Sequence, residues 1–514
     1  MNIAKRLEEN AHKYLKKTAL IFKDKRVNFL ELKDLTFKLK EAFKNLGLKK
    51  TDKVAIYLPN CPEYVYTYLA IFSLGLVAVP LDFMLTEEEL VSCISHAQAK
   101  ILIAKEKPSL SFISLKKKIP QLEKIILCGE KKEGFLTFEE LLESSPEEIL
   151  PPEDIDDKAQ AIIFYTSGTT GKPKGVLINY RQLSAPMQAV SYFTELNDKD
   201  ICLCAIPFSH IAGLMFVQAI VFLGASVVLM ERFIPVEFLK LVEEYKVTIF
   251  WLVPAMYYAL LHLKEFEVFD LSSLKTVVCF GAPSSPEQLK RFHQYCPNAD
   301  LINGWGMTET QGPTVVLPRG SSKVESVGKP APWIEVKIFS AEGGCGGDES
   351  EKELPIGEVG EIVVRSWVVT DGYYKDPELT AQTKRNGWFH TGDLGRFDKD
   401  GFLYIVGRKK EMIKVAGEIV FEPEVEAAIY KHPAVKEVAV VGVEDKLRGE
   451  VPYAFVVLKD NLKLTAEELR YFLRQHLGHF KIPHYFEFRD ELPKNRTGKI
   501  DKETLRNEAK LAQG

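Results

Sequence analysis

The sequence has almost no net charge. Its 67 lysine and arginine residues are balanced by 71 aspartate and glutamate residues, which leaves a formal charge of −4. A chain without a net basic field is not drawn as a whole onto nucleic acid or anionic lipid. The balance argues against a nucleic-acid-binding function, and it leaves peripheral contact with a membrane open.

Cysteine is scarce and thinly spread. Eight cysteines in 514 residues do not suit a disulfide-stabilised secreted fold. Cys202 and Cys204 form a C-x-C pair inside an apolar run, which is weak evidence for a metal site. We interpret them as small core residues on one strand. The N-terminal segment MNIAKRLEENAHKY lacks the apolar stretch of a signal peptide, so we expect a reduced, cytoplasmic protein.

Long hydrophobic runs are also rare, and only residues 211–230 are apolar enough to suggest a transmembrane segment. Residues 219–230 resemble residues 70–81, with a Leu-Gly pair in register. Both favour a helix, a turn and a β-branched strand, a succession typical of a soluble α/β core. We therefore predict a buried helix, a turn at Gly224 and a buried strand from Ser226 to Met230, rather than a membrane span.

The order of apolar segments predicts an α/β protein. Residues 18–104 and 160–320 alternate short strands with amphipathic helices, which indicates parallel sheets covered by helices. Residues 335–405 are rich in glycine and strand patterns, which favours a β subdomain. We place a large domain of two parallel-sheet lobes plus this subdomain at 1–407, a hinge at 408–410 and a small, mobile α+β domain at 411–514.

The strongest functional signal is the loop YTSGTTGKPKGV, from Tyr165 to Val176, which follows an apolar strand. Glycines let backbone N–H groups approach phosphate closely, while hydroxyls and lysines bind and neutralise its oxygens. Pro173 follows the first lysine and the glycine spacing is not that of a P-loop, which disfavours a kinase or GTPase. The candidate phosphate-binding residues are Thr166, Ser167, Gly168, Thr169, Thr170, Gly171, Lys172 and Lys174.

This loop resembles the phosphate-binding loop of the adenylate-forming superfamily, which includes acyl-CoA synthetases, luciferases and peptide-synthetase adenylation domains. Further segments resemble the family's motifs in order, from about residue 18 to residue 502. The resemblance implies an AMP-forming acid–thiol ligase of fatty acid or lipid metabolism. Such an enzyme joins a carboxylic acid to CoA through an acyl-adenylate, and it uses ATP, Mg²⁺ and coenzyme A.

A second motif, NGWGMTE, runs from Asn303 to Glu309. By resemblance it lies along the adenosine, with Trp305 against the adenine and Thr308 at the α-phosphate. Glu309 and Thr166 are the expected Mg²⁺ ligands, since a hard cation prefers oxygen. The remaining residues that the resemblance assigns to the nucleotide are Gly304, Gly306 and Met307, together with Gly281, Ala282 and Pro283 of the loop FGAP.

A third motif, WFHTGDLG, contains Asp393, and a carboxylate can accept from both ribose hydroxyls. Arg408, fifteen residues further on, resembles a ribose- or phosphate-binding residue. Lys410 matches the hinge position of the family. Lys414 and Gly417 match the face that is presented during thioester formation, where the glycine passes close to the pantetheine of CoA.

Two more residues complete the expected catalytic set of Lys499, Lys414, His210, Thr308 and Arg408. Lys499, in PKNRTGKI, matches the lysine that reaches the carboxylate and the α-phosphate during adenylation. A cation there stabilises the negative charge that gathers when a carboxylate attacks a phosphate. His210, in PFSHIAG, matches a residue beside the acyl pocket.

The acid substrate is the least determined feature. Gly306 stands where acetate-type relatives carry a second bulky aromatic, and Ala212, Gly213 and Ala282 are small where an acyl tunnel needs room. These residues favour a medium- or long-chain fatty acid, with a cinnamate- or benzoate-type acid as the alternative.

Three other functions are compatible with parts of the sequence. A fatty acyl-AMP ligase that loads a carrier protein usually has an inserted segment, and only the short loop 343–353 is present here. A luciferase-type oxidase shares the fold. A non-catalytic nucleotide-binding protein is expected to lack Lys499, Glu309 or Asp393, and all three are present. The oligomeric state, including a homodimer, stays open.

Overall fold

The computed structural model describes residues 3–144, 154–166, 173–264, 266–281, 286–341, 352–416, 418–494 and 500–513. The chain divides into two compact units. The first comprises Met1–Glu335 and Arg365–Gly387, and the second comprises Val336–Val364 and Trp388–Gly514. The boundaries expected from the sequence, at residues 407 and 411, stay predictions.

One parallel sheet of the first unit carries the expected phosphate-binding hairpin. Its order in the described residues is β7-β6-β5-β3-β4-β8-β9, and the pairs are parallel except for the antiparallel pair β8–β9. The strands are β3 (Lys53–Tyr57), β4 (Val77–Pro80), β5 (Ile101–Lys105), β6 (Lys124–Cys128), β7 (Leu136–Thr137), β8 (Gln160–Thr166) and β9 (Lys174–Asn179).

Helices cover both faces of this sheet. Leu90 and Ile94 of α4 and Leu115 of α5 join one buried cluster, whereas α2 and α3 belong to another. Asn28 and Thr86 cap α2 and α4 in capping boxes, each with a glutamate three residues later, which explains where these helices begin. The helices are α2 (Phe29–Asn45), α3 (Pro62–Ser73), α4 (Glu87–Ala97), α5 (Phe112–Lys118) and α6 (Phe138–Glu143).

The second sheet of this unit has the order β16-β15-β14-β13-β12-β10-β11-β1-β2 in the described residues. The pairs from β1 to β14 are parallel, and the edges β2, β15 and β16 are antiparallel. The strands are β1 (Thr18–Phe22), β2 (Lys25–Asn28), β10 (Ile201–Cys204), β11 (Ser226–Leu229), β12 (Ile249–Leu252), β13 (Thr276–Cys279), β14 (Asp300–Met307), β15 (Gly312–Val316) and β16 (Lys329–Pro330).

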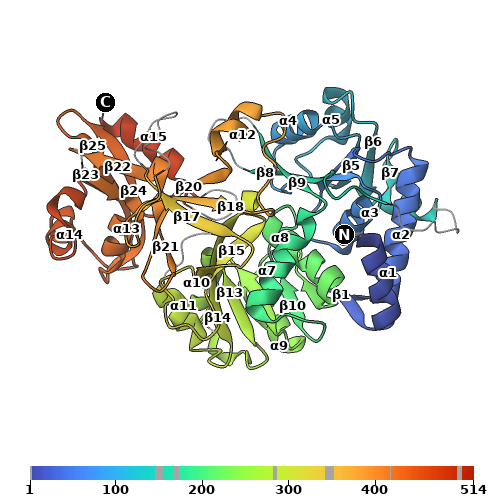
Figure 1. Cartoon of the computed structure of the whole chain (residues 1–514), viewed down its shortest axis with the longest axis horizontal. Coiled ribbons are helices and arrows are strands. Elements are labelled where there is room, and N and C mark those ends of the chain that lie inside the picture. Colours follow the sequence, from blue (N-terminus) through green and yellow to red (C-terminus); the bar gives the residue numbers. More distant parts are fainter. Residues whose placement is uncertain are drawn as a thin grey trace. The chain divides into compact units, whose positions relative to one another are not determined.

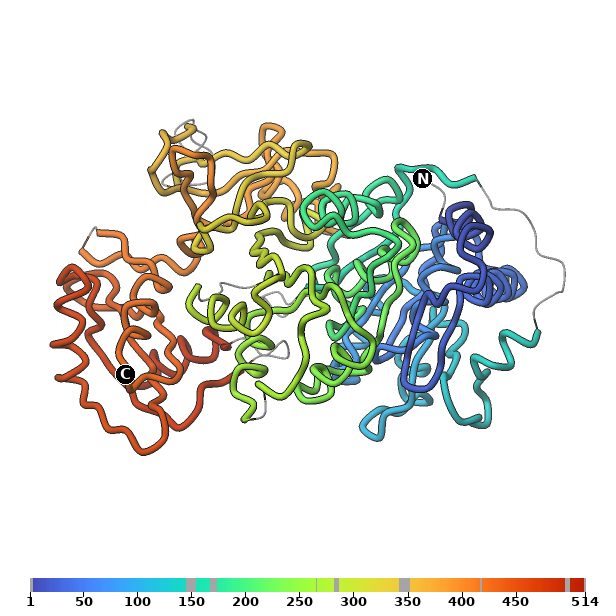
Figure 2. Tube along the Cα trace, turned by 90° about the horizontal axis from the view of Figure 1, so that it is seen from below, coloured from blue at the N-terminus to red at the C-terminus, as the bar shows by residue number. Residues whose placement is uncertain are grey.

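Helices α9, α10 and α11 cover one face of this second sheet, while α7 and α8 pack side by side on the other (Figure 1). One buried cluster contains residues of both sheets, such as Ile56 and Ile249, so the two lobes share a core. The helices are α1 (Ile3–Tyr14), α7 (Ala185–Thr194), α8 (Ile211–Gln218), α9 (Pro235–Glu244), α10 (Pro254–Leu261) and α11 (Pro286–His293). The two blue helices at the N-terminal end, α1 and α2, lie beside each other (Figure 2).

The long apolar run folds as predicted. Helix α8 continues as a π-helical turn, η2 (Ala219–Leu223), the chain reverses at Gly224 with φ +70°, and β11 follows. Cys202 and Cys204 are buried together on β10, also as predicted. None of the helices in the described ranges combines the length and apolarity that a membrane span needs.

The second unit contains two sheets. Strands β17 (Glu335–Phe339), β18 (Gly360–Arg365), β20 (Trp388–Phe397) and β21 (Leu403–Arg408) follow one another in the β subdomain. A C-terminal sheet has the order β23-β22-β25-β24, with β26 paired to β25. Its elements are β22 (Met412–Val415), β23 (Glu418–Phe421), β24 (Val435–Asp445), β25 (Gly449–Leu458), β26 (Tyr485–Arg489), α13 (Glu422–Tyr430), α14 (Ala466–Leu473) and α15 (Lys502–Gln513).

Short elements complete the description. The first unit adds η1 (Gln182–Ser184), η3 (Phe266–Val268), η4 (Thr308–Thr310), α12 (Pro377–Thr383) and β19 (Lys384–Arg385). The second adds η6 (Lys409–Glu411) and η7 (His479–Lys481). The α/β class, with two parallel-sheet lobes, a β subdomain and a C-terminal α+β region, is confirmed.

Gly224 makes a testable contribution to stability. A Cβ at this position would lie 2.4 Å from the Tyr14 ring, and the positive φ adds backbone strain. We expect Gly224→Ala to lower the free energy of unfolding by about 2–4 kcal/mol, the sum of a left-handed alanine and overpacking. Gly47→Ala is the control, because its φ is +83° but its Cβ would meet nothing within 4 Å. Equal losses in urea unfolding would contradict the predicted clash.

Candidate active site

The ends of the predicted phosphate loop lie at the carboxyl edge of the first sheet. Thr166 ends β8 and pairs with Lys174, the first residue of β9, so an antiparallel hairpin closes the loop at its base. Both residues are half-buried. Ser167, Gly168, Thr169, Thr170, Gly171 and Lys172 lie outside the described residues, and their roles stay predictions.

Neighbouring strand ends of the second sheet bring the predicted adenosine-side residues together. Cys279 of β13 pairs with Asn303 of β14, so Gly281 follows one strand where Asn303 and Trp305 lie on the next. The Asn303 side chain accepts from Gly304 N–H at 3.0 Å and donates to Ser326 O at 3.3 Å. Trp305 is buried. Ala282 and Pro283 lie outside the described residues.

The reason why position 306 is a glycine differs from the one that the sequence suggested. A Cβ there would lie 1.9 Å from Gly312 O and 2.8 Å from Pro313 Cα, within the β14–β15 hairpin. The missing side chain therefore leaves no open space, because the opposite strand occupies it. The glycine is required by the close approach of two strands, so it is not evidence for a larger acyl pocket.

Glu309 is held by a residue that the sequence analysis missed. The Tyr373 hydroxyl donates to Glu309 Oε1 at 3.0 Å, and Thr370 N–H donates to Glu309 O at 2.7 Å. Burial, together with the charge of Glu309, raises the pKa of Tyr373, which keeps its proton available for this bond. Thr308 begins the short helix η4 that presents Glu309, and Met307 N–H is capped by Thr310. No pattern around Tyr373 distinguishes it from a core tyrosine.

Glu309 has the chemistry that a magnesium ion requires. Its carboxylate is a hard oxygen donor, and Mg²⁺ is commonly held by one or two carboxylates together with phosphates and water. Within the described ranges, no group of three or more histidine, cysteine, aspartate or glutamate side chains could form an all-protein metal site. The carboxylate of Glu309 is the described group that fits the expected magnesium ion.

His210 immediately precedes α8, and its Nε2 lies 3.7 Å from Asp82 Oδ2. Asp82 follows β4 of the first sheet and His210 follows β10 of the second, so the pair joins the strand ends of both lobes. The His210 side chain is 39% exposed, which leaves it accessible. The sequence analysis singled out His210 but not its acidic partner.

An apolar cavity lies between helix α7 and the second sheet. Helix α7 supplies one wall, and β12 to β15 supply the other. The lining residues are Ala189, Val190, Phe193, Thr194, Trp251, Val278, Phe280, Ile302, Gly304, Pro313 and Val316. The Thr194 hydroxyl donates to Val190 O at 2.7 Å, and Trp251 Nε1–H donates to Ala212 O at 2.8 Å. The polar groups of both side chains are thus already bonded within the protein.

In the second unit, Asp393 and Arg408 form a cross-strand pair. They face each other on β20 and β21, and Arg408 Nε lies 3.0 Å from Asp393 Oδ1. Asp393 is buried, whereas the Arg408 side chain is 52% exposed. The two residues that resemblance assigns to the ribose and phosphate are therefore neighbours.

A buried carboxylate, Glu361, supports this pair from β18. Its Oε1 accepts from Gly392 N–H, and its Oε2 lies 3.1 Å from Lys409 Nζ and 3.4 Å from His390 Nδ1. Burial by itself would raise the pKa of Glu361, but the hydrogen bond to His390 and the charge of Lys409 outweigh it and lower the pKa to about 2. Glu361 thus connects the residue before Asp393 to the residue after Arg408.

The predicted hinge and C-terminal residues are placed as follows. Lys410 lies in η6, where burial and the charge of Arg408 lower its pKa. Lys414 is exposed on β22, and its N–H donates to Glu450 Oε2 at 2.9 Å. Gly417 and Lys499 lie outside the described residues. Lys494 and Ile500, which flank the predicted catalytic loop, form an antiparallel bridge.

A family model described as AMP-binding enzyme matches residues 7–374, and one described as AMP-binding enzyme C-terminal domain matches residues 424–499. The chain belongs to the AMP-binding enzyme family. The predicted superfamily is confirmed, and the protein is an enzyme of the AMP-forming acyl-CoA ligase class.

Curated relatives and solved structures match nearly the whole enzyme. It is 34% identical to the long-chain-fatty-acid–CoA ligase of Bacillus subtilis (strain 168), over 98% of this chain and 93% of that protein. It is 33% identical to 4-coumarate–CoA ligase 1 of Solanum tuberosum, over 96% and 90% of the two chains. The anthranilate CoA ligase AuaEII, solved with anthranoyl-AMP, superposes with a TM-score of 0.90 at 28% identity and covers 100% of this chain and 98% of its own.

The Tyr373–Glu309 hydrogen bond of the first unit leads to one testable prediction. We expect Tyr373→Phe to lower the rate of ATP–pyrophosphate exchange about tenfold, because Glu309 loses a charged hydrogen bond worth about 1.5 kcal/mol. Tyr374→Phe is the matched control, since its hydroxyl lies 3.5 Å from Ala97 O and away from Glu309. Equal rates in the two variants would contradict a role for the Tyr373–Glu309 bond.

The buried carboxylate of Glu361 in the second unit leads to another prediction. Because the folded pKa of Glu361 is about 2, below the ordinary value of 4.5, its ionised form stabilises the fold above pH 4.5. That contribution disappears as the pH falls from 4.5 toward 2. We expect Glu361→Gln to cost about 2–3 kcal/mol in urea unfolding at pH 7 and progressively less below pH 5. The exposed neighbour Glu358→Gln should change little at any pH, and a pH-independent loss in Glu361→Gln would contradict this reasoning.

Proposed function

We propose that this enzyme is an ATP-dependent carboxylate–CoA ligase whose acid has an apolar, unsubstituted tail. A medium- or long-chain fatty acid is the first candidate. The observation that carries the proposal is the apolar cavity between α7 and β12–β15, whose described lining offers no charged side chain. Among the described lining residues, the side chains with polar groups are Thr194 and Trp251, and both are already bonded internally.

This lining discriminates between the acids of the relatives. The hydroxyl of coumarate and the amino group of anthranilate would each be buried without a partner, at a cost of about 1–3 kcal/mol. A second carboxylate, as in o-succinylbenzoate, would cost more. An alkyl tail has no such group and gains about 0.8 kcal/mol for each methylene that it buries. The polarity of the lining therefore favours the aliphatic acid.

An unsubstituted aromatic acid is the second candidate. Phe193, Trp251 and Phe280 supply aromatic surface to the cavity, and aromatic pairs gain about 0.5–1.5 kcal/mol beyond their buried area. Cinnamate and benzoate carry no polar substituent on the ring. They are compatible with the lining where coumarate is not.

The proposed chemistry has two steps. The acid carboxylate attacks the α-phosphate of ATP, pyrophosphate leaves, and an acyl-adenylate forms. The thiol of CoA then attacks the acyl carbon, losing its proton, and AMP leaves. Because no covalent enzyme intermediate is needed, catalysis depends on positioning and electrostatics.

Residue roles follow the motifs that this chain carries. Lys499 and Thr308 would stabilise charge at the α-phosphate, and Asp393 with Arg408 would bind the ribose. Mg²⁺, when bound at Glu309, would neutralise phosphate charge. His210 would border the acid, and Lys414 with Gly417 would act in the thioester step. A fatty acyl-AMP ligase shares the first step only, so the acceptor is decided by experiment.

The test is pyrophosphate and AMP release by the purified chain with ATP and Mg²⁺, with and without CoA. The acids are acetate to palmitate in even steps, benzoate, cinnamate and 4-coumarate. We expect CoA-dependent turnover with one aliphatic chain length preferred, and cinnamate used about 10-fold or more better than 4-coumarate. Preference for coumarate would overturn the apolar-tail proposal. A pyrophosphate burst without CoA-dependent turnover would instead favour carrier-protein loading.

A further inference from the structure

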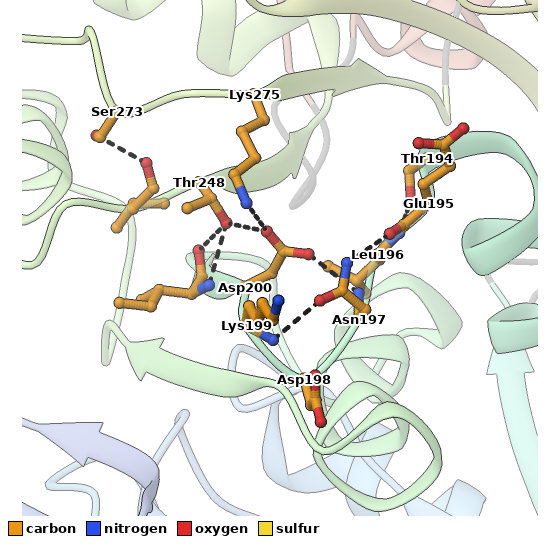
Figure 3. A network of polar contacts seen from close by, with 12 residues as sticks. Thr194, Glu195, Leu196, Asn197, Asp198, Lys199, Asp200, Thr248, Ser273 and Lys275 are labelled. Carbon is orange, nitrogen blue, oxygen red and sulfur yellow. Dashed lines mark hydrogen bonds and ion pairs between the residues drawn. The ribbon is translucent and has the colours of Figure 1, made fainter.

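One buried carboxylate connects the two walls of the apolar cavity. Asp200 is 5% exposed and immediately precedes β10, at the amino edge of the second sheet. Figure 3 shows it at the centre of a polar network that reaches the end of α7 on one side and the residues before β12 and β13 on the other. All of these residues belong to the first unit.

One side of the network holds the turn that follows α7. Thr194, the last residue of the helix and part of the cavity lining, accepts from Leu196 N–H at 3.3 Å. Asn197 N–H donates to Asp200 Oδ2 at 3.0 Å, and Asp200 N–H donates back to Asn197 O at 3.2 Å. The turn from Thr194 to Asp200 is therefore closed by the carboxylate, and the end of α7 is attached to it (Figure 3).

The other carboxylate oxygen holds the facing wall. Asp200 Oδ1 accepts from Thr248 Oγ1 and from Lys275 Nζ, both at 2.9 Å. Thr248 directly precedes β12 and Lys275 directly precedes β13. Trp251 lies three residues after Thr248, and Val278 lies three residues after Lys275. These two residues pair in register and both line the cavity.

We propose that Asp200 is a positioning residue for acyl-tail selectivity, which sets the separation of α7 from β12 and β13 and thereby the width of the cavity. The inference rests on the proposed function, because it assigns the acid tail to that cavity. Asp200 does not touch the substrate. It acts through Thr194 on one wall and through Trp251 and Val278 on the other.

The chemistry of the carboxylate explains why asparagine cannot replace it. In Asp200 both oxygens accept hydrogen bonds, one from Asn197 N–H and the other from Thr248 and Lys275. An asparagine has one acceptor and one donor at these positions. In either orientation of the amide, its NH₂ group faces another donor, and one side of the network is released. The side-chain volume is unchanged, so Asp200→Asn tests the hydrogen bonds alone.

The experiment compares Asp200→Asn with the wild-type chain over straight-chain acids, with kcat/KM measured by pyrophosphate release. We expect the ratio of kcat/KM for the preferred acid to kcat/KM for the acid two methylenes longer to fall by about threefold or more. A loosened cavity wall distinguishes less well between tails of different length. The KM for ATP should not change. Asp270→Asn is the matched control, since Asp270 also pairs with a lysine, Lys246 at 2.9 Å, but lies outside this network.

The outcomes separate positioning from general stability. A purely structural effect would lower kcat for every acid by the same factor, and an unchanged ratio would overturn the inference. If Asp200→Asn does not fold, Thr248→Val, which removes one hydroxyl donor, must shift the ratio in the same direction. Wild-type turnover with unchanged ratios refutes only this inference. Absence of pyrophosphate release by the wild type with every acid refutes the proposed function and this inference with it.

Discussion

The close approach of β14 and β15 is the constraint on which the predicted site of the first unit depends. The two strands pass so near each other that Gly306 has no room for a side chain. This hairpin carries Glu309 at its turn and contributes Gly304, Pro313 and Val316 to the apolar cavity. A single local geometry therefore determines where a predicted phosphate-side carboxylate and a predicted acid tail lie relative to each other. Loosening it would disturb both at once.

Buried carboxylates fix backbone segments in both units. Glu361 joins Gly392 to Lys409, and Asp200 joins the turn after α7 to the starts of β12 and β13. Each is more than nine-tenths buried, so its charge is tolerable only with several donors around it. Such a group specifies one backbone arrangement strongly, because every alternative leaves a buried charge with too few partners. Residues predicted to face the ligands, such as Asp393 and Arg408, are thus positioned by residues to which no ligand contact is assigned.

Much of this architecture could be predicted from the sequence, because it follows local patterns. Gly224 and the strand after it follow from a Leu-Gly turn that occurs twice, and strand ends follow from glycine and proline clusters. Pairings between distant segments could not be predicted. Tyr373 meets Glu309, and Asp82 meets His210, only in the folded chain, where segments far apart in the sequence come together. Gly306 shows a different limit of sequence reasoning. The sequence shows the glycine, but it does not show that β15 occupies the space of the missing side chain.

Overall similarity does not decide which acid the enzyme uses. The chain is 34% identical to a ligase named for long-chain fatty acids and 33% identical to one named for 4-coumarate, a difference too small to carry an argument. The polarity of the cavity lining is more informative, because polar and apolar sites discriminate between substrates to very different degrees. A site built to bind a hydroxyl discriminates by about 10⁴-fold against an analogue that lacks the hydroxyl. An apolar site discriminates by only about 10–200-fold for each methylene of the tail. A lining whose polar side chains, Thr194 and Trp251, are bonded internally is therefore the feature on which the proposed preference for an apolar tail rests.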